Sequence, residues 1–216
     1  MGRLTGGPAP RKARMSTREP KQERSRATRR RLLESAIDCL AAHGWQATTV
    51  SVVAEQAGVS RGAAQHHFPT REDLITAALE LMTDSRLELI REEARGLPDG
   101  PGRTEAVLRR MVEHFTSPLF KAALQVWTAA AADESLKQRI VPLEARFGRA
   151  AHRVTVELLG VDDSDPVAHR LVQGTLDMAR GLGLADVLTD DSARRERIVL
   201  QWSATLDAAL RRSPSP

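Results

Sequence analysis

"RRRLLESAIDCLAAHGWQATTVSVVAEQAGVSRGAAQHHFPTREDLI", residues 29–75, contains three consecutive helix-like patterns separated by short turns. In the first pattern, apolar residues recur every three or four positions at Leu33, Ile37 and Leu40. This spacing is typical of a helix with one buried face. The pattern ends at His43-Gly44, where a glycine fits the C-terminal cap of a helix.

The next two patterns predict a helix-turn-helix. Thr48 and Thr49 are N-cap candidates for a second helix that closes at Gly58, and a third helix starts at Ser60 and is broken at Pro69-Thr70. Two short helices joined by a glycine-containing turn form a motif whose second helix is shaped to enter the DNA major groove. Any small helical bundle contains such corners, so the pattern alone is only moderately specific.

The whole stretch resembles the N-terminal domain of TetR-family transcriptional regulators. Four features match in order: a first helix ending in "HGW", the "TTV" start of the second, "AEQAGVS", and a short helix ending in "HF" before "PTREDL". The resemblance implies an all-α fold with an N-terminal helix-turn-helix DNA-binding domain and a C-terminal helical domain for effector binding and dimerisation. It also implies that residues 60–67 are the recognition helix.

By this resemblance, Gln65 and His66 are the expected base-reading residues, whereas His67 and Phe68 anchor the end of the helix. Glutamine can pair bidentately with adenine, and small residues at the start of the helix let it approach the duplex closely. The family often has tyrosine where Gln65 stands, so its sequence preference does not transfer. The full set of expected DNA-contacting residues is Arg26, Arg30, Thr48, Thr49, Ser60, Arg61, Gly62, Ala63, Gln65, His66, His67 and Arg71.

The positive charge is concentrated at one end of the chain. Residues 1–31 carry eleven Lys and Arg residues against two Glu residues, a formal charge of +9, although the 216-residue chain has a net charge of only +4. A polyanion is the natural partner of such a segment, although a solvated tail would look the same. We expect residues 1–24 to be a disordered basic arm in which Arg11, Lys12 and Arg14 add affinity for DNA.

We expect residues 25–75 to form the DNA-binding domain and residues 76–212 the C-terminal domain. A fourth helix starts at Thr70 and can bridge both, and the Gly- and Pro-rich residues 95–103 form a loop. Further helices are predicted at roughly 104–116, 118–132, 134–159, 165–186 and 191–211. Pro142 is expected to kink or interrupt the third of these.

Two further sites are expected in the C-terminal half. An effector pocket is expected to be mostly apolar with a few polar anchors, and its candidates are Met111, His114, Phe115, Phe120, Gln125, Trp127, Arg146 and Phe147. Each of these residues could equally be ordinary core. A homodimer is expected through the last two helices, with Gly174, Gly181, Ile198, Trp202 and Leu206 at the interface and Gly183 easing the helix approach.

The sequence lacks the common catalytic and metal-binding motifs. The sequence contains no H-E-x-x-H, no G-x-S-x-G and no phosphate-cradling Gly-Lys-Ser/Thr loop, so neither an enzyme nor a cofactor or metal site is expected. "DDSDP", residues 162–166, lacks the length of a calcium loop and suits a capped helix start. Cys39, the only cysteine, and His43 are expected to pack in the core.

We therefore expect an effector-responsive regulator, most simply a repressor, that binds a near-palindromic double-stranded DNA operator as a homodimer. No signal peptide or membrane helix is indicated, so the cytoplasm is the expected location. One alternative is an all-helical small-molecule binding or enzymatic protein whose basic tail serves another purpose. A second is a DNA-binding regulator that lacks an effector.

Overall fold

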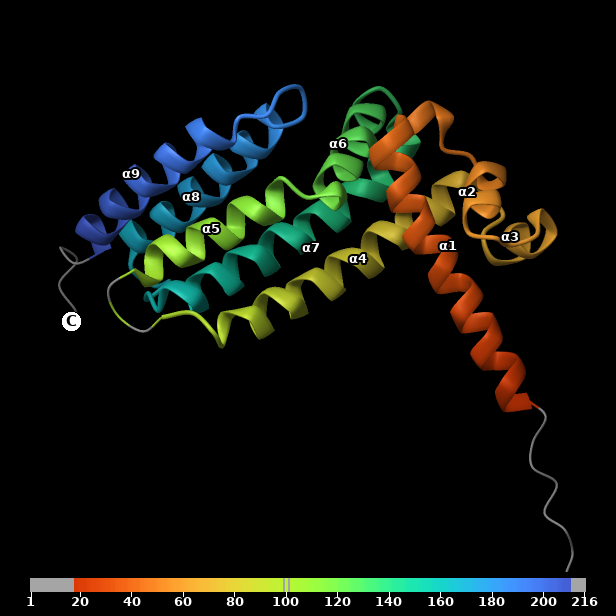
Figure 1. Ribbon diagram of the computed structural model, residues 1–216, viewed down its shortest axis with the longest axis horizontal. Coiled ribbons are helices and arrows are strands. Elements are labelled where there is room, and N and C mark those ends of the chain that lie inside the picture. Colours follow the sequence, from red (N-terminus) through yellow and green to blue (C-terminus); the bar gives the residue numbers. More distant parts are fainter. Residues whose placement is uncertain (1–17, 99, 101, 211–216) are drawn as a thin grey trace, which may run out of the picture.

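The protein is described by a computed structural model that covers residues 18–98, 100 and 102–210. The described residues form nine α-helices and no β-strand, as the sequence predicts (Figure 1). The helices are α1 (Arg18–Ala47), α2 (Val50–Gln56), α3 (Arg61–His67), α4 (Arg71–Ala94), α5 (Arg103–Phe115), α6 (Pro118–Ala131), α7 (Glu134–Leu159), α8 (Pro166–Ala185) and α9 (Ser192–Leu210). Of the helices in these ranges, none is long and apolar enough to cross a lipid bilayer.

Helix α1 starts earlier than the sequence predicts. Residues 18–24 were expected to belong to a disordered arm, but they form the first turns of α1. A run of charged, straight-chain residues has good helix propensity even though it contains no apolar periodicity. The remainder of the expected arm, residues 1–17, lies outside the described residues. The helix breaks at Gly44, whose φ of 73° fits the predicted cap.

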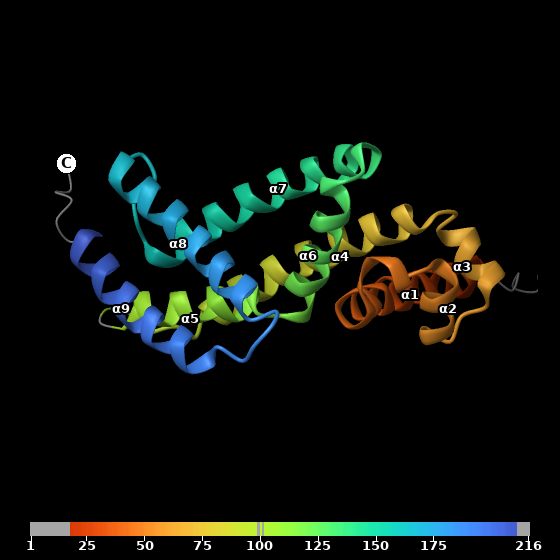
Figure 2. The same cartoon turned by 90° about the horizontal axis from the view of Figure 1, so that it is seen from above.

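The predicted helix-turn-helix is formed by α2 and α3, which pack against the middle of α1 (Figures 1 and 2). Thr49 Oγ1 accepts a hydrogen bond from the backbone N–H of Val52, and Ser60 Oγ accepts one from that of Ala63. Gly58 makes the turn between the helices with a φ of 62°, a conformation that side chains disfavour. Local capping and one left-handed glycine therefore fix both helix starts and the turn.

Helix α4 joins the two halves of the protein. Its first turn is capped by Thr70, whose Oγ1 accepts a hydrogen bond from the backbone N–H of Asp73. The helix then packs on α1 near its start and on α7 further along, as its predicted bridging role requires. Arg139 Nη2 in α7 and Asp73 Oδ1 in α4 are 2.6 Å apart, so an ion pair adds to this contact.

The C-terminal helices agree with the predicted ranges to within one or two residues, but α7 runs through Pro142 without interruption. Proline removes one backbone hydrogen bond, and the carbonyl that loses its partner belongs to Gln138. Both Gln138 and Pro142 are exposed, so water can satisfy that carbonyl and the helix continues.

The apolar core is divided into two clusters that do not follow the predicted domain boundary. The first cluster contains α1 to α4 together with the inner face of α6 and the start of α7, including Ala122, Val126 and Ile140. The second contains α5, the rest of α7, α8 and α9. Helix α6 therefore packs into the core of the half that contains the helix-turn-helix, although it follows α4 and α5 in the chain.

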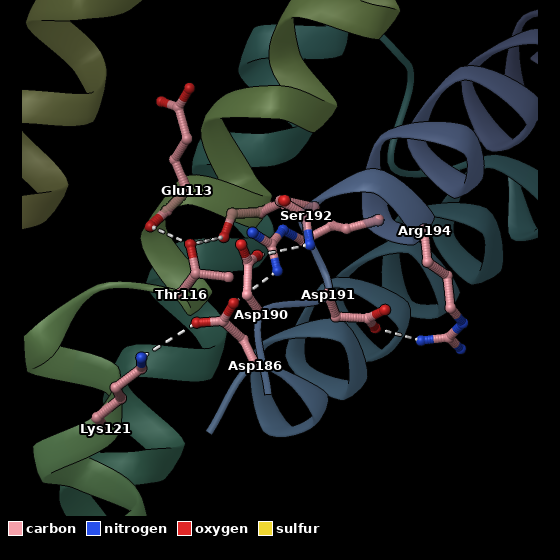
Figure 3. Close-up of polar contacts among 10 residues, drawn as sticks. Glu113, Thr116, Lys121, Asp186, Asp190, Asp191, Ser192 and Arg194 are labelled. Carbon is pink, nitrogen blue, oxygen red and sulfur yellow. Dashed lines mark hydrogen bonds and ion pairs between the residues drawn. The ribbon is translucent and has the colours of Figure 1, made fainter. Parts of the chain in front are cut away.

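A polar network holds the turn between α8 and α9 against α6 (Figure 3). Asp186, only 14% exposed, lies 3.1 Å from Lys121 Nζ through Oδ2 and 2.7 Å from Arg195 Nη1 through Oδ1. Burial disfavours the charge of Asp186, but the hydrogen bonds from Lys121 and Arg195 outweigh it and lower the pKa of the carboxyl. Three segments distant in sequence are thereby joined at one buried carboxylate.

Candidate DNA-binding site and ligand cavity

Helix α3 has one buried face and one exposed face. Ala64 is fully buried and Phe68 is 3% exposed, so this side of the helix packs on α1 and α2. Arg61 and Gln65 are four positions apart, and so are Gly62 and His66. All four residues are exposed, so together they form one broad face. This face combines hydrogen-bonding groups with a site of close approach, as the sequence predicts for a recognition helix.

His67 lies beside this face and is half-buried. Its ring contacts those of His66 and Phe68, with centroids 5.8 and 6.3 Å away. Burial lowers the pKa of His67, and the charges of His66 and Arg29 act in the same direction. His67 is therefore held neutral at neutral pH and contributes to the anchoring of the helix, whereas His66 remains exposed.

The two threonines before α2 have different environments. Thr49 is exposed at the helix start, where its hydroxyl and the free N–H groups suit a phosphate. Thr48 is fully buried and its Oγ1 donates a 2.8 Å hydrogen bond to the carbonyl of Gly44. The Thr48 hydroxyl therefore closes the kink after α1 and is not exposed for the DNA contact that the sequence predicts for it.

Arg71 is held by the protein itself. Its guanidinium carbon lies 4.2 Å from the centroid of the Trp45 ring, and its Nη1 donates to the Trp45 carbonyl at 3.4 Å. Its Nε also pairs with Glu72 at 3.2 Å. Arg71 is 28% exposed, so it keeps some access to solvent while it fixes the start of α4 against the end of α1.

The basic face of α1 adds further positive charge near α3. Arg26 and Arg30 are exposed and four positions apart, and Arg30 Nε pairs with Glu34 at 3.4 Å. Arg29 places its guanidinium 5.2 Å from the Phe68 ring centroid, a contact between α1 and the end of α3 that the sequence did not reveal. The predicted contacts of Arg11, Lys12 and Arg14 fall on residues outside the described ranges.

A cavity lies between α4, α5, α6 and α7, next to the half that contains the helix-turn-helix. Its walls include His114, Phe120, Trp127, Arg146 and Phe147, all predicted effector-site residues. A second cavity follows, lined in part by Met111, Phe115 and again His114 and Phe147. The free space in the first is about 40 Å³, enough for a few water molecules, so a larger ligand requires the walls to move.

Gln125 is the predicted effector-site residue that lines neither cavity. It is exposed on α6, and its Oε1 faces Gly44 at the end of α1. On α6, Gln125 is two positions from Ala123 and from Trp127, which is about 200° around the helix, so it points away from the cavity wall. Gln125 therefore belongs to the contact between α6 and α1.

The polar groups of the first cavity include the predicted Trp127 and one residue that the sequence did not indicate, Glu144. Glu144 in α7 is partly buried among apolar walls, and burial raises the pKa of its carboxyl, against the opposing influences of Trp127 and Arg180. The indole Nε1 of Trp127 is buried and faces the Glu144 carboxyl closely enough to lower its pKa, but the geometry falls short of a hydrogen bond. The two groups together offer a ligand one donor and one carboxyl inside an apolar wall.

Comparison with known proteins supports the reading of this geometry. The sequence profile described as "Bacterial regulatory proteins, tetR family" matches residues 32–78. The HTH-type transcriptional repressor AcnR of Corynebacterium efficiens is 31% identical over 183 residues, which cover 78% of this chain and 93% of AcnR. The chain belongs to the TetR family of transcriptional regulators. Its helix-turn-helix is thus the motif of that family.

Other relatives agree over nearly the whole chain. The HTH-type transcriptional regulator CymR of Pseudomonas putida is 28% identical over 205 residues, covering 90% of this chain and 95% of CymR. A solved structure of a candidate transcriptional regulator from Pseudomonas aeruginosa PAO1 has a TM-score of 0.65 at 24% identity, covering 95% of this chain and all of that one. At this level of identity, the likeness to the solved structure is one of fold.

The predicted dimer-interface residues of this TetR-family chain lie in two environments. Gly174 and Gly181 are exposed on α8 with no other atoms near an added Cβ, and Ile198 and Trp202 are half-buried on α9. Leu206 is only 1% exposed and packs in the core of its own subunit. Gly183 is buried too: a Cβ there would lie 2.1 Å from the carbonyl oxygen of Phe115, so this glycine serves packing of α8 on α5.

Several other side chains differ from the sequence predictions. Cys39 is buried as expected, and its Sγ donates to Gln56 Oε1 at 3.0 Å, whereas His43 is exposed and not part of the core. In "DDSDP", Asp165 caps α8 as predicted, with its carboxylate accepting from the N–H groups of Val167 and Ala168. The neighbouring Asp163 has a different environment, because it faces two histidines.

Proposed function

We propose that this TetR-family regulator acts as a homodimeric repressor that leaves a near-palindromic operator when a small, largely apolar effector binds. The observation that carries the proposal is the sharing of α4 and α6 between the two functions. Both helices line the cavity, and both pack on α1 in the core of the DNA-binding half. Protein interiors deform little, so a change in the cavity is passed to the helices on its far side.

The route from the cavity to the DNA can be followed through individual contacts. Leu79 and Thr83 of α4 line the cavity, and the same helix begins with Arg71, which clamps Trp45. Phe120 and Trp127 of α6 line it too, while on the side of α6 that faces α1, Gln125 contacts Gly44. An effector that separates these helices would shift α1 and change the spacing of the two recognition helices in the dimer.

The proposed effector has an apolar body and a polar group. Aromatic walls supply most of the contact area, Trp127 Nε1 offers a donor, and Glu144 offers a carboxyl. A multidrug binding protein of the same fold, EbrR, was solved in complex with imidazole, at 20% identity and a TM-score of 0.58. Repression is the activity named for AcnR, and binding to an operator without chemistry is the proposed mode of action here.

The dimer is proposed to form through a partly exposed apolar stripe of α8 and the adjoining face of α9. The stripe repeats every three or four positions and consists of Val167, Leu171, Gly174, Met178 and Gly181. Glycines in such a stripe let two helices approach closely, and a two-fold axis brings the same stripe from each subunit together. Because α8 and α9 belong to the second core cluster, the dimer interface would lie between the two C-terminal halves, which contain the cavities, and not between the DNA-binding halves.

The experiment combines operator selection with ligand screening on the full chain. A randomised duplex library identifies the bound sequence, and a thermal-shift screen of apolar compounds identifies ligands that raise the melting temperature. Ala123→Leu fills the cavity from α6, and the exposed Ala131→Leu on the same helix is its control. The proposal expects Ala123→Leu to bind operator but no longer to respond to the ligand, and Ala131→Leu to respond normally.

Two results would contradict parts of this proposal separately. If no duplex is enriched, the chain alone does not bind a specific DNA sequence. If an operator is enriched but Ala123→Leu is released by the ligand as readily as the wild type, the effector binds elsewhere. If an operator is enriched and no ligand weakens binding, the alternative of a regulator without an effector is correct.

A further inference from the structure

Two histidines and an aspartate meet at the corner between α7 and α8. His152 comes from α7, Asp163 from the connecting loop, and His169 from the first turns of α8. His152 Nε2 lies 2.7 Å from Asp163 Oδ1, and His169 Nδ1 lies 3.0 Å from the same oxygen. One ligand atom from each of the three residues lies within 4.8 Å of the other two.

The loop that carries Asp163 is fixed at both ends. Gly160 closes α7 with a φ of 65°, and Asp165 caps the start of α8. Between them, Asp162 Oδ1 accepts a 2.9 Å hydrogen bond from the backbone N–H of Ser164, which makes a local turn. His152 is only 14% exposed, so its ring is also held by its surroundings. The three side chains therefore converge from supported positions.

We propose that His152, Asp163 and His169 bind a divalent transition-metal ion of the zinc class. Two imidazoles and one carboxylate form the donor set of many open metal sites. Ligand atoms about 2.1 Å from a tetrahedral ion stand about 3.4 Å apart, by the geometry of the tetrahedron. The nitrogen-to-oxygen distances of 2.7 and 3.0 Å need to widen only slightly, and the ion would replace the protons that now join them.

A purely structural role of the three residues explains less of the arrangement. Both histidines share a single oxygen of Asp163, and their ring centroids are 4.6 Å apart. A single divalent ion satisfies all three groups at once and joins α7 to α8 through the loop.

The surroundings set the affinity and the ion type. Arg149, Arg153 and Arg180 line the adjacent groove together with Asp177, so the local potential is positive. This charge weakens cation binding compared with a buried cysteine site and favours water or a small anion at the open coordination positions. Imidazole donors favour zinc, cobalt, nickel and copper over calcium and magnesium.

The site does not depend on the proposed effector cavity or dimer. His169 and Gly174 are five positions apart on α8, so they point about 140° apart around the helix. The site therefore opens away from the glycine stripe and stays accessible if two subunits meet there. Both Asp163 and His169 are 42% exposed, so substitutions at these two positions leave the core intact.

The test uses the full chain after removal of metals with a chelator. Cobalt(II) is titrated first, because its visible absorption reports coordination by protein ligands, and zinc(II) is then measured by calorimetry. The expected result is one ion bound per chain, with at least tenfold weaker binding in Asp163→Asn and in His169→Gln. Calcium(II) at the same concentration is expected to bind at least tenfold more weakly than zinc(II).

His43→Ala is the matched control, because it removes an exposed histidine far from the corner. Circular dichroism confirms that each variant is folded, and His169→Gln keeps a polar group where a folding defect is least expected. The proposal fails if the wild type shows no cobalt absorption at saturating metal. It also fails if His43→Ala lowers the affinity as much as Asp163→Asn does.

Discussion

Gly44 and Gln125 lie against each other where α1 meets α6: a Cβ added to Gly44 would stand 3.1 Å from Gln125 Oε1. The contact connects the kink at the end of α1 to the helix that lines the ligand cavity. Two requirements coincide at this glycine, since its φ of 73° disfavours any side chain and the neighbouring amide leaves little space. The contact between Gly44 and Gln125 therefore joins the DNA-binding half directly to a helix that lines the cavity.

Gly44→Ala is expected to destabilise the protein. With φ 73° and ψ 179°, the backbone of Gly44 lies in a region essentially restricted to glycine, which costs a side chain about 1–3 kcal/mol, and the close approach of Gln125 adds to it. Thermal unfolding measures the effect, and Gly148→Ala is the control, because Gly148 is helical with open space around it. Alanine is the better helix former, so the control should be neutral or more stable than the wild type. Equal losses in both variants would contradict the explanation.

Gly183→Ala and Gly174→Glu are expected to separate subunit packing from dimer formation. The Cβ of the first would meet backbone of α5, so the free energy of unfolding should fall by about 1–3 kcal/mol or more. The second adds a charge on the partly exposed stripe, so it should yield a folded monomer in sedimentation while the wild type is dimeric. A dimeric Gly174→Glu variant would place the interface elsewhere. Leu206 is unsuitable for this test, because a charge there would disrupt the subunit core.

Gln65→Ala and Arg30→Ala are expected to affect DNA binding in different ways. Loss of a bidentate base contact costs about 1–3 kcal/mol and relaxes the preference at one base position, whereas loss of a phosphate contact weakens all sequences and lowers the salt slope by about one unit. Selection from a randomised operator library at two salt concentrations measures both. An unchanged sequence preference in Gln65→Ala, with a changed one in Arg30→Ala, would reverse the assigned roles.

Arg71→Lys tests whether Arg71 acts mainly within the protein. Lysine keeps the positive charge for a phosphate but loses the planar stacking on Trp45 and the donor to its carbonyl. We expect a lower melting temperature together with weaker DNA binding, because the start of α4 is no longer held to the end of α1. A variant with wild-type stability and wild-type affinity would show that only the charge matters.

Asp186 is expected to make the protein less stable in acid. Its pKa in the folded protein is lowered, so the stability it contributes is present above the unfolded value of about 4 and is lost as the pH falls through the lower folded value. Asp186→Asn should therefore lower the melting temperature at pH 7 but make little difference near pH 2. The exposed Asp84→Asn is the control. A difference that grows towards acid would contradict the ion-pair explanation.

The sequence by itself determined the helices, their caps and the motif. Apolar spacing placed α5 to α9 to within two residues, and Thr49, Ser60 and Thr70 were identified as helix starts from side chains that bond to their own next turn. These features depend on residues a few positions apart, so the local sequence contains the information. Positions 60–67 as the recognition helix came from the resemblance to the TetR family, which the comparisons confirm.

The tertiary structure decided which side of each helix is buried against other helices and which side is exposed. Thr48 and Thr49 are adjacent and chemically identical, yet one is buried against Gly44 and the other is exposed, because α1 covers only one of them. Gly181 and Gly183 differ in the same way, as only the second faces α5. Asp163 meets histidines from two helices because the fold of a corner brings together residues whose contacts no local periodicity encodes.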